Sequence, residues 1–227
     1  LRELGVHNSS VFLTNATIWV EGITDRLYLK TYMKKYAKDN IEYEHLQEDI
    51  HYSFVEYQGS NLVHWDFSSE DSDTERIRAC FLCGNPFLLA DRDIISKGNR
   101  KRVFQDMLGE DRFEVLKCKE IENLVPEEVV RTLVRGKLAD CDTGLSVIKY
   151  EEYSTSEEGL GKYLDEKLAL PNGDAVFAST TGTIKNKVGF CRRACELMNE
   201  DQVQWSLTTP IRELCEKIFS FISKQDQ

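Results

Sequence analysis

The chain has little of what several common protein classes require. Only 4 of its 227 residues are proline and 13 are glycine, which excludes collagen-like and low-complexity disordered proteins. No uninterrupted apolar run approaches the ~18 residues that a membrane-spanning helix needs, so we expect no membrane partner. With 41% hydrophobic and 30% charged residues, the composition is that of a globular protein with a real core.

Histidine and cysteine occur without the spacings that zinc sites use. The four histidines form neither an H-x3-H nor an H-E-x-x-H pattern, and no second C-x-x-C follows Cys80 and Cys83 at zinc-finger spacing. The seven cysteines are odd in number and irregularly spaced, which favours a reducing, cytoplasmic location over a disulfide framework. Because the sequence starts at Leu1 instead of a methionine, we expect a fragment of a longer protein.

The charge balance excludes a protein that coats nucleic acid through a generally basic surface. There are 29 Lys and Arg against 39 Asp and Glu, a net charge of −10. Nucleic acid stays open as a partner, since bound cations would neutralise clustered carboxylates and local basic segments contact phosphates. Six residues form such segments and are candidates for DNA contacts, although a plain solvated surface explains them equally well: Lys97, Arg100, Lys101, Arg102, Arg192 and Arg193.

Strand and helix patterns alternate through the first half of the chain. Residues 16–20, 52–57, 87–90 and 113–116 have the β-branched and apolar character of strands, and the run 87–90 is typical of a strand buried on both faces. Helical periodicity occupies 25–36 and a stretch ending at 108. We therefore predict an α/β, Rossmann-like fold with a mainly parallel four-stranded sheet flanked by helices.

The second half of the chain has helical patterns only. A helix is expected from Pro126 to about Arg135, where Gly136 would end it, and others at 157–168, 188–198 and 211–222. The acidic segment 66–75 reads as a loop. These patterns divide the chain into an α/β core (1–125), a small helical insertion (126–173) and a C-terminal helical part (174–227). We expect the C-terminal part to complete the active site described below.

Acidic residues follow three of the predicted strands. Because the carboxyl ends of parallel strands meet at one edge of a sheet, we expect these residues to surround one pocket: Glu21, Asp25, Asp91, Asp93, Glu120 and Glu122. In extended backbone Asp91 and Asp93 would point the same way. Clustered carboxylates repel one another unless a cation intervenes, and oxygen ligands suit Mg²⁺ or Mn²⁺. Any one of them alone could be only a helix cap or turn former, but agreement between three strand ends favours a metal site.

The motifs at these strand ends resemble those of the TOPRIM domain. Residues 20–25 (VEGITD) and 88–93 (LLADRD) match its glutamate after the first strand and its D-x-D after the third. Together with 120–123 (EIEN) and 182–190 (GTIKNKVGF), the chain is similar to the C-terminal nuclease region of OLD (overcoming lysogenization defect) family proteins. That resemblance implies a metal-dependent DNA endonuclease, a hydrolase of phosphodiesters, in an antiviral defence or DNA-repair protein of bacteria. Its other partners would be a missing N-terminal ABC-type ATPase region and further copies of the parent protein.

The resemblance also implies roles for individual residues. Glu21, Asp91 and Asp93 would bind metal directly, and Asp25 with Glu122 or Glu120 would complete a second site for two Mg²⁺ or Mn²⁺ ions. Lys187, or next Lys185, would supply positive charge near the scissile phosphate, unless these lysines are simply solvated at a helix start. No nucleotide-binding motif is expected in this fragment.

Three other functions compete with this interpretation. A topoisomerase needs a nucleophilic tyrosine, and none of the nine tyrosines can be assigned that role. A primase would need zinc-binding and helicase-interacting regions that this sequence lacks. A non-catalytic DNA-binding module, like a recombination mediator, is the remaining alternative, although it gains nothing from unpaired acids facing DNA phosphates.

Overall fold

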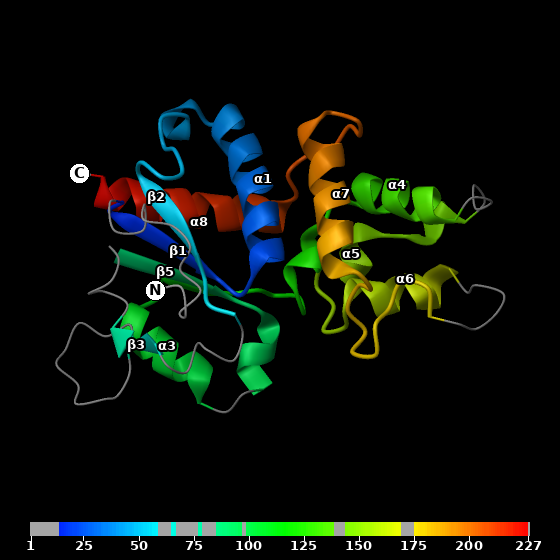
Figure 1. The fold of residues 1–227 in the computed structure, drawn as a ribbon, viewed down its shortest axis with the longest axis horizontal. Helices are drawn as coiled ribbons and strands as arrows, with labels where there is room; N and C mark the ends of the chain where they lie inside the picture. The colour runs from blue at the N-terminus through cyan, green and yellow to red at the C-terminus, as the bar shows by residue number, and fades with distance from the viewer. Residues whose placement is uncertain are drawn as a thin grey trace.

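A parallel sheet forms the centre of the molecule. The computed structural model describes residues 14–58, 65–66, 77–78, 85–96, 99–138, 144–168 and 175–226. The sheet contains β1 (Ala16–Val20), β2 (Tyr52–Glu56), β5 (Asn85–Ala90) and β6 (Phe113–Val115), all parallel and in the order β2-β1-β5-β6 (Figure 1). The predicted α/β fold with a four-stranded parallel sheet is confirmed. The chain moves outward from β1 to β2 and then to the other side of β1, so the topological switch point lies between β1 and β5.

Helices cover both faces of this sheet. Alternate residues of β1 point to opposite faces, so Ile18 packs with α1 (Ile23–Asp39) and α8 (Thr209–Gln225), while Trp19 packs with α3 (Arg100–Leu108). Figure 1 shows α1 and α8 on one side and α3 on the other. Burial on both faces explains why β1 and β5 are nearly continuous apolar runs.

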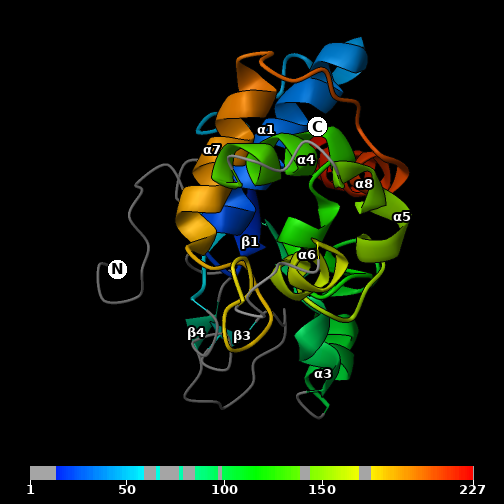
Figure 2. The same ribbon diagram turned by 90° about the vertical axis from the view of Figure 1, so that its right-hand side faces the viewer.

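The remaining helices lie beside the sheet (Figures 1 and 2). They are α4 (Glu127–Lys137), α5 (Tyr150–Tyr153), α6 (Leu160–Leu168) and α7 (Lys187–Asn199), with short 3-10 turns η3 (Ile41–Tyr43), η5 (Arg92–Ser96), η6 (Ile121–Leu124) and η7 (Leu145–Val147). The expectation that Gly136 ends α4 is wrong, because the helix continues to Lys137 and Leu138 N–H donates to Val134 O across that last turn. Glycine inside a helix costs only about 1 kcal/mol, which the burial of Val129, Val130 and Val134 outweighs.

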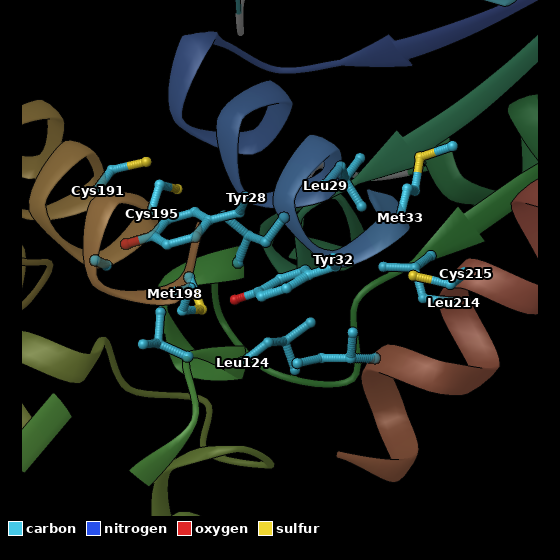
Figure 3. Close-up of a cluster of buried hydrophobic side chains, with 14 of the residues drawn as sticks. Tyr28, Leu29, Tyr32, Met33, Leu124, Cys191, Cys195, Met198, Leu214 and Cys215 are labelled. Atoms are coloured by element: carbon cyan, nitrogen blue, oxygen red, sulfur yellow. The ribbon is translucent and has the colours of Figure 1, made fainter. Parts of the chain in front are cut away.

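A buried cluster joins α7 and α8 to the core. Figure 3 shows Tyr28 and Tyr32 of α1 between Cys191 and Cys195 of α7 and Leu214 of α8. The two tyrosine rings are stacked, with centroids 6.0 Å apart. The C-terminal helices therefore pack directly on the first helix of the α/β core, while the three-part division of the chain stays a prediction.

A second, small ladder was not expected from the sequence. β3 (Trp65–Asp66) pairs in parallel with β4 (Ile77–Arg78), so Asp66 belongs to a strand. The rest of the predicted 66–75 loop lies outside the described residues, as do Lys97 and the Cys80 and Cys83 pair. In the part of the chain that the structure describes, no helix is long and apolar enough to cross a bilayer.

Candidate functional site

The carboxyl ends of three strands converge at the topological switch point. Glu21 directly follows β1, Asp91 directly follows β5, and the turn η6 with Glu122 comes after β6. Ligand sites of open α/β sheets form at this edge, since loops and helix N-termini meet there.

Asp25 belongs to the first turn of α1 and is 5% exposed. Its Oδ2 accepts a hydrogen bond from Gly22 N–H at 3.1 Å, so it caps the helix, as the alternative interpretation from sequence allowed. Burial, with a smaller contribution from the charge of Glu21, raises the pKa of the Asp25 carboxyl to about 6 against the opposing effect of Lys187. An aspartate that only caps a helix at the protein surface would be neither buried nor affected by charges such as those of Glu21 and Lys187.

Asp91 lies within electrostatic reach of carboxylates from the other strand ends. Burial raises its pKa well above the usual value, and the charges of Asp25, Glu21 and Glu122 add to that rise. Lys187 acts in the opposite direction. Asp91 therefore interacts electrostatically with side chains that are far apart in the sequence, while a shared metal site stays a prediction.

Asp93 is placed differently from the expectation. The extended backbone expected for 91–93 is wrong, because η5 begins at Arg92 and turns the chain immediately after Asp91. The side chain of Asp93 is exposed at the rim, although its charge, like that of Asp91, contributes to the raised pKa of the buried Tyr57 hydroxyl. Arg92 donates to Lys117 O at 2.5 Å and pairs with Glu157.

Lys187 lies between the two glutamates of the EIEN motif. Its Nζ is 3.2 Å from Glu120 Oε2 and 3.1 Å from Glu122 Oε2, and both glutamates are buried. Burial, together with the charge of Glu120, raises the pKa of Glu122 to about 8 against the opposing effect of Lys187. The pKa of Lys187 is raised in return: burial lowers it, but the carboxylates, led by Glu122, outweigh that effect. Both alternatives for the second carboxylate therefore contact the same lysine.

The turn before α7 places Lys187 at the helix start. Asn186 has a left-handed backbone (φ 51°), and its side chain accepts a hydrogen bond from Gly189 N at 3.3 Å. A Cβ at position 189 would lie 2.3 Å from Asn186 Nδ2, so this cap conformation of Asn186 requires a glycine at position 189. A lysine at a helix N-terminus is unfavourable by itself, and its carboxylate partners offset that cost.

Two residues that support the site had no role assigned from sequence. Asn123 is fully buried and donates through Nδ2 to Tyr153 O at 2.8 Å and Glu158 O at 2.9 Å, which ties the helical insertion to η6. At Gly159, a Cβ would lie 2.5 Å from Gly182 O and 2.9 Å from Glu120 Oε1. The EIEN motif was the only signal for Asn123, and Gly159 gave none, because its close contacts come from distant segments.

Among the described residues, the other basic candidates form no ion pair with these carboxylates. Lys185 Nζ donates to Ala175 O, and no ion pair of Lys185 occurs within the described ranges. Arg193 pairs with Glu196 at 3.1 Å, and Arg192 is exposed on the same helix, α7. Three others, Arg100, Lys101 and Arg102, belong to α3.

The donor set fits a hard divalent cation in charge and chemistry. All the candidates are carboxylate oxygens, and Glu120 Oε1 and Glu122 Oε1 are buried without a hydrogen-bond partner among the described residues, at a cost of roughly 1–3 kcal/mol each. Across the described ranges, no three Asp, Glu, His or Cys side chains converge closely enough to hold an ion. Binding an ion would therefore require side-chain rotation within this cluster.

Comparisons with protein-family models, with curated proteins and with solved structures gave no match. The chemistry proposed for this site therefore depends on its own residues.

Proposed function

We propose that this chain is a metal-dependent DNA endonuclease that hydrolyses phosphodiester bonds with two Mg²⁺ or Mn²⁺ ions. One observation carries the proposal: acids from three strand ends and one lysine gather at the switch point, where their mutual repulsion and burial raise the pKa values of Asp25, Asp91 and Glu122. A protein that only folds gains nothing from such repulsion, whereas divalent ions would relieve it.

The carboxylates divide into two groups by position. Glu21 and Asp91, at the ends of neighbouring strands, would hold one ion, with Asp93 at the rim. Asp25 with Glu122 or Glu120 would hold the second. When bound, such ions supply a hydroxide nucleophile and stabilise the leaving oxygen.

Lys187 has two functions in this proposal. Without metal its single positive charge offsets part of the charge of Glu120 and Glu122, which lessens the repulsion between two buried acids. With DNA bound, its ammonium at the start of α7 would stabilise the charge that develops on the phosphate. We assign this role to Lys187 over Lys185, because Lys187 contacts the carboxylates.

The wider setting is also proposed from the resemblance. The parent protein would place an ABC-type ATPase region before this domain, associate through several copies and act in the bacterial cytoplasm in phage defence or DNA repair. The ATPase would gate cleavage, so the isolated chain should cut slowly.

A DNA-binding module without chemistry is the second candidate. The ion pairs of Lys187 favour it, since they stabilise Glu120 and Glu122 without any metal. Among the described residues, Glu21 and Asp91 form no ion pair, and this alternative leaves their position at neighbouring strand ends unexplained.

Incubation of supercoiled plasmid with Mg²⁺, Mn²⁺ or EDTA distinguishes the two. We expect nicked and linear products that disappear with EDTA and in Asp91→Asn, but persist in the matched control Asp39→Asn, an exposed residue at the far end of α1. A mobility shift without any cleavage would support the binding module, and closed relaxed topoisomers would indicate strand passage.

A further inference from the structure

The segment that follows β2 adds a fourth strand end to the candidate site. Tyr57 is the first residue after β2 and is 4% exposed. Its N–H donates to Val20 O at 2.9 Å, and the N–H of Gln58 donates to Glu21 O at 2.9 Å. Main-chain hydrogen bonds from this segment therefore hold the end of β1 and the backbone of Glu21.

The side chain of Tyr57 reaches past the neighbouring strand. Its hydroxyl donates to Leu89 O of β5 at 3.2 Å, and this hydrogen bond is buried. Because β1 lies between β2 and β5, and adjacent strands are separated by roughly 4.8 Å, the bond links strands that are about 10 Å apart. Tyr57 packs with Trp19 and Leu88, so its ring crosses the end of β1 on the face that α3 covers.

This hydrogen bond lies where the two central strands separate. The registered pairs of β1 with β5 stop at Trp19 and Leu88. Leu89 lies beyond that last pair and two residues before Asp91. The bond from Tyr57 to the Leu89 carbonyl therefore ties β5 to the ends of β1 and β2 at the topological switch point, immediately before the chain leaves the sheet.

The Tyr57 hydroxyl also lies within electrostatic reach of the candidate metal ligands. Burial raises its pKa well above the usual value, and the charges of four acids add to that rise: Glu21, Asp91, Asp25 and Asp93. The hydroxyl therefore stays protonated at neutral pH and remains a hydrogen-bond donor. Its protonation and its bond to a main-chain carbonyl argue against a role as a phenolate ligand or a nucleophile.

We propose that Tyr57 is a positioning residue of the metal site, which fixes the separation of Glu21 and Asp91 by tying together the strand ends that carry them. The inference rests on the proposed function and adds a residue that lies outside the acidic motifs. Groups that orient metal ligands without touching the ion typically change the metal affinity about 10- to 100-fold when they are removed. Tyr57 would act in this way through the main chain of its neighbours.

Binding of Mn²⁺ alone tests this role without DNA cleavage. The EPR signal of free Mn²⁺ gives the amount bound as the ion is titrated into the full chain. Tyr57→Phe removes only the hydroxyl. The matched control is Tyr163→Phe in α6, where a tyrosine that is 7% exposed loses a hydroxyl that accepts from Lys149 N–H at 2.8 Å.

We expect Tyr57→Phe to bind Mn²⁺ about tenfold more weakly or worse, and Tyr163→Phe to change the affinity less than about twofold. Both variants lose a hydrogen bond of a buried hydroxyl, so urea denaturation in EDTA should show both midpoints lowered by a similar amount. A merely structural tyrosine would lower the midpoint without changing the Mn²⁺ affinity. Equal affinity in Tyr57→Phe and wild type, or an equal loss in both variants, would overturn the inference.

Failure of the positioning role and failure of the nuclease proposal give different results. If wild-type protein binds Mn²⁺ and cuts plasmid but Tyr57→Phe binds the ion as tightly, only the positioning role is refuted. If Tyr57→Phe loses affinity but wild-type protein never cuts plasmid, the positioning role stands and the nuclease proposal falls. A wild-type protein that binds no Mn²⁺ would refute both.

Discussion

Replacing Asp25 by asparagine should stabilise the metal-free protein. The amide is nearly isosteric with the carboxyl, and its oxygen can still accept the hydrogen bond from Gly22 N–H. The substitution therefore keeps the helix cap and removes only the buried negative charge. Most substitutions at buried polar positions destabilise, so a gain would be diagnostic.

The size and sign of the effect follow from the raised pKa. The Asp25 pKa rises from 3.8 to about 6 on folding, which costs the charged folded state about 3 kcal/mol at a pH above both values. A raised carboxyl pKa means that the folded state binds the proton more tightly, so wild-type stability is lost as the pH rises through 6. Asparagine does not titrate, and the gain should be up to about 3 kcal/mol at pH 8 and approach zero near pH 4.

Urea denaturation in EDTA at several pH values measures this difference. Asp39→Asn, at the exposed end of the same helix, should change the free energy of unfolding by less than about 0.5 kcal/mol at every pH. A loss of 1 kcal/mol or more in Asp25→Asn at pH 8 would refute the reasoning, since Asp25 would then act only as a cap.

Three further substitutions test other parts of the site. Asp91→Asn should reduce cleavage at least a thousandfold in the plasmid assay while circular dichroism shows a folded protein; retained cutting would remove Asp91 from the metal site. Lys187→Gln should destabilise the metal-free protein by about 3 kcal/mol in urea, because it leaves buried acids uncompensated, and an unchanged midpoint would contradict the ion pairs. Gly159→Ala should cost about 1–3 kcal/mol by displacing Glu120 Oε1 and Gly182 O. Its control, Gly136→Ala in α4, meets no atom within 4 Å and should stabilise by up to about 1 kcal/mol; the same result at both glycines would refute the close contact.

Local patterns in the sequence were sufficient to predict the sheet and to place the acids that follow its two central strands. The apolar runs at β1 and β5 identify buried strands, and the acids that follow them must meet because parallel strands end at one edge. Glu21 and Asp91 could therefore be placed near each other without coordinates.

What the sequence could not provide depends on turns and on contacts between distant segments. A 3-10 turn rotates Asp93 to the rim, and no periodicity signals so short an element. The contact of Lys187 with Glu120 and Glu122 joins segments more than 60 residues apart.

Diffraction from crystals soaked in Mn²⁺ tests the central claim most directly, since anomalous scattering locates the ion independently of activity. The account predicts one or two manganese peaks at the ends of β1 and β5, with Glu21 and Asp91 oxygens within about 2.3 Å. Manganese bound only elsewhere, with Lys187 still paired with Glu120 and Glu122, would contradict it.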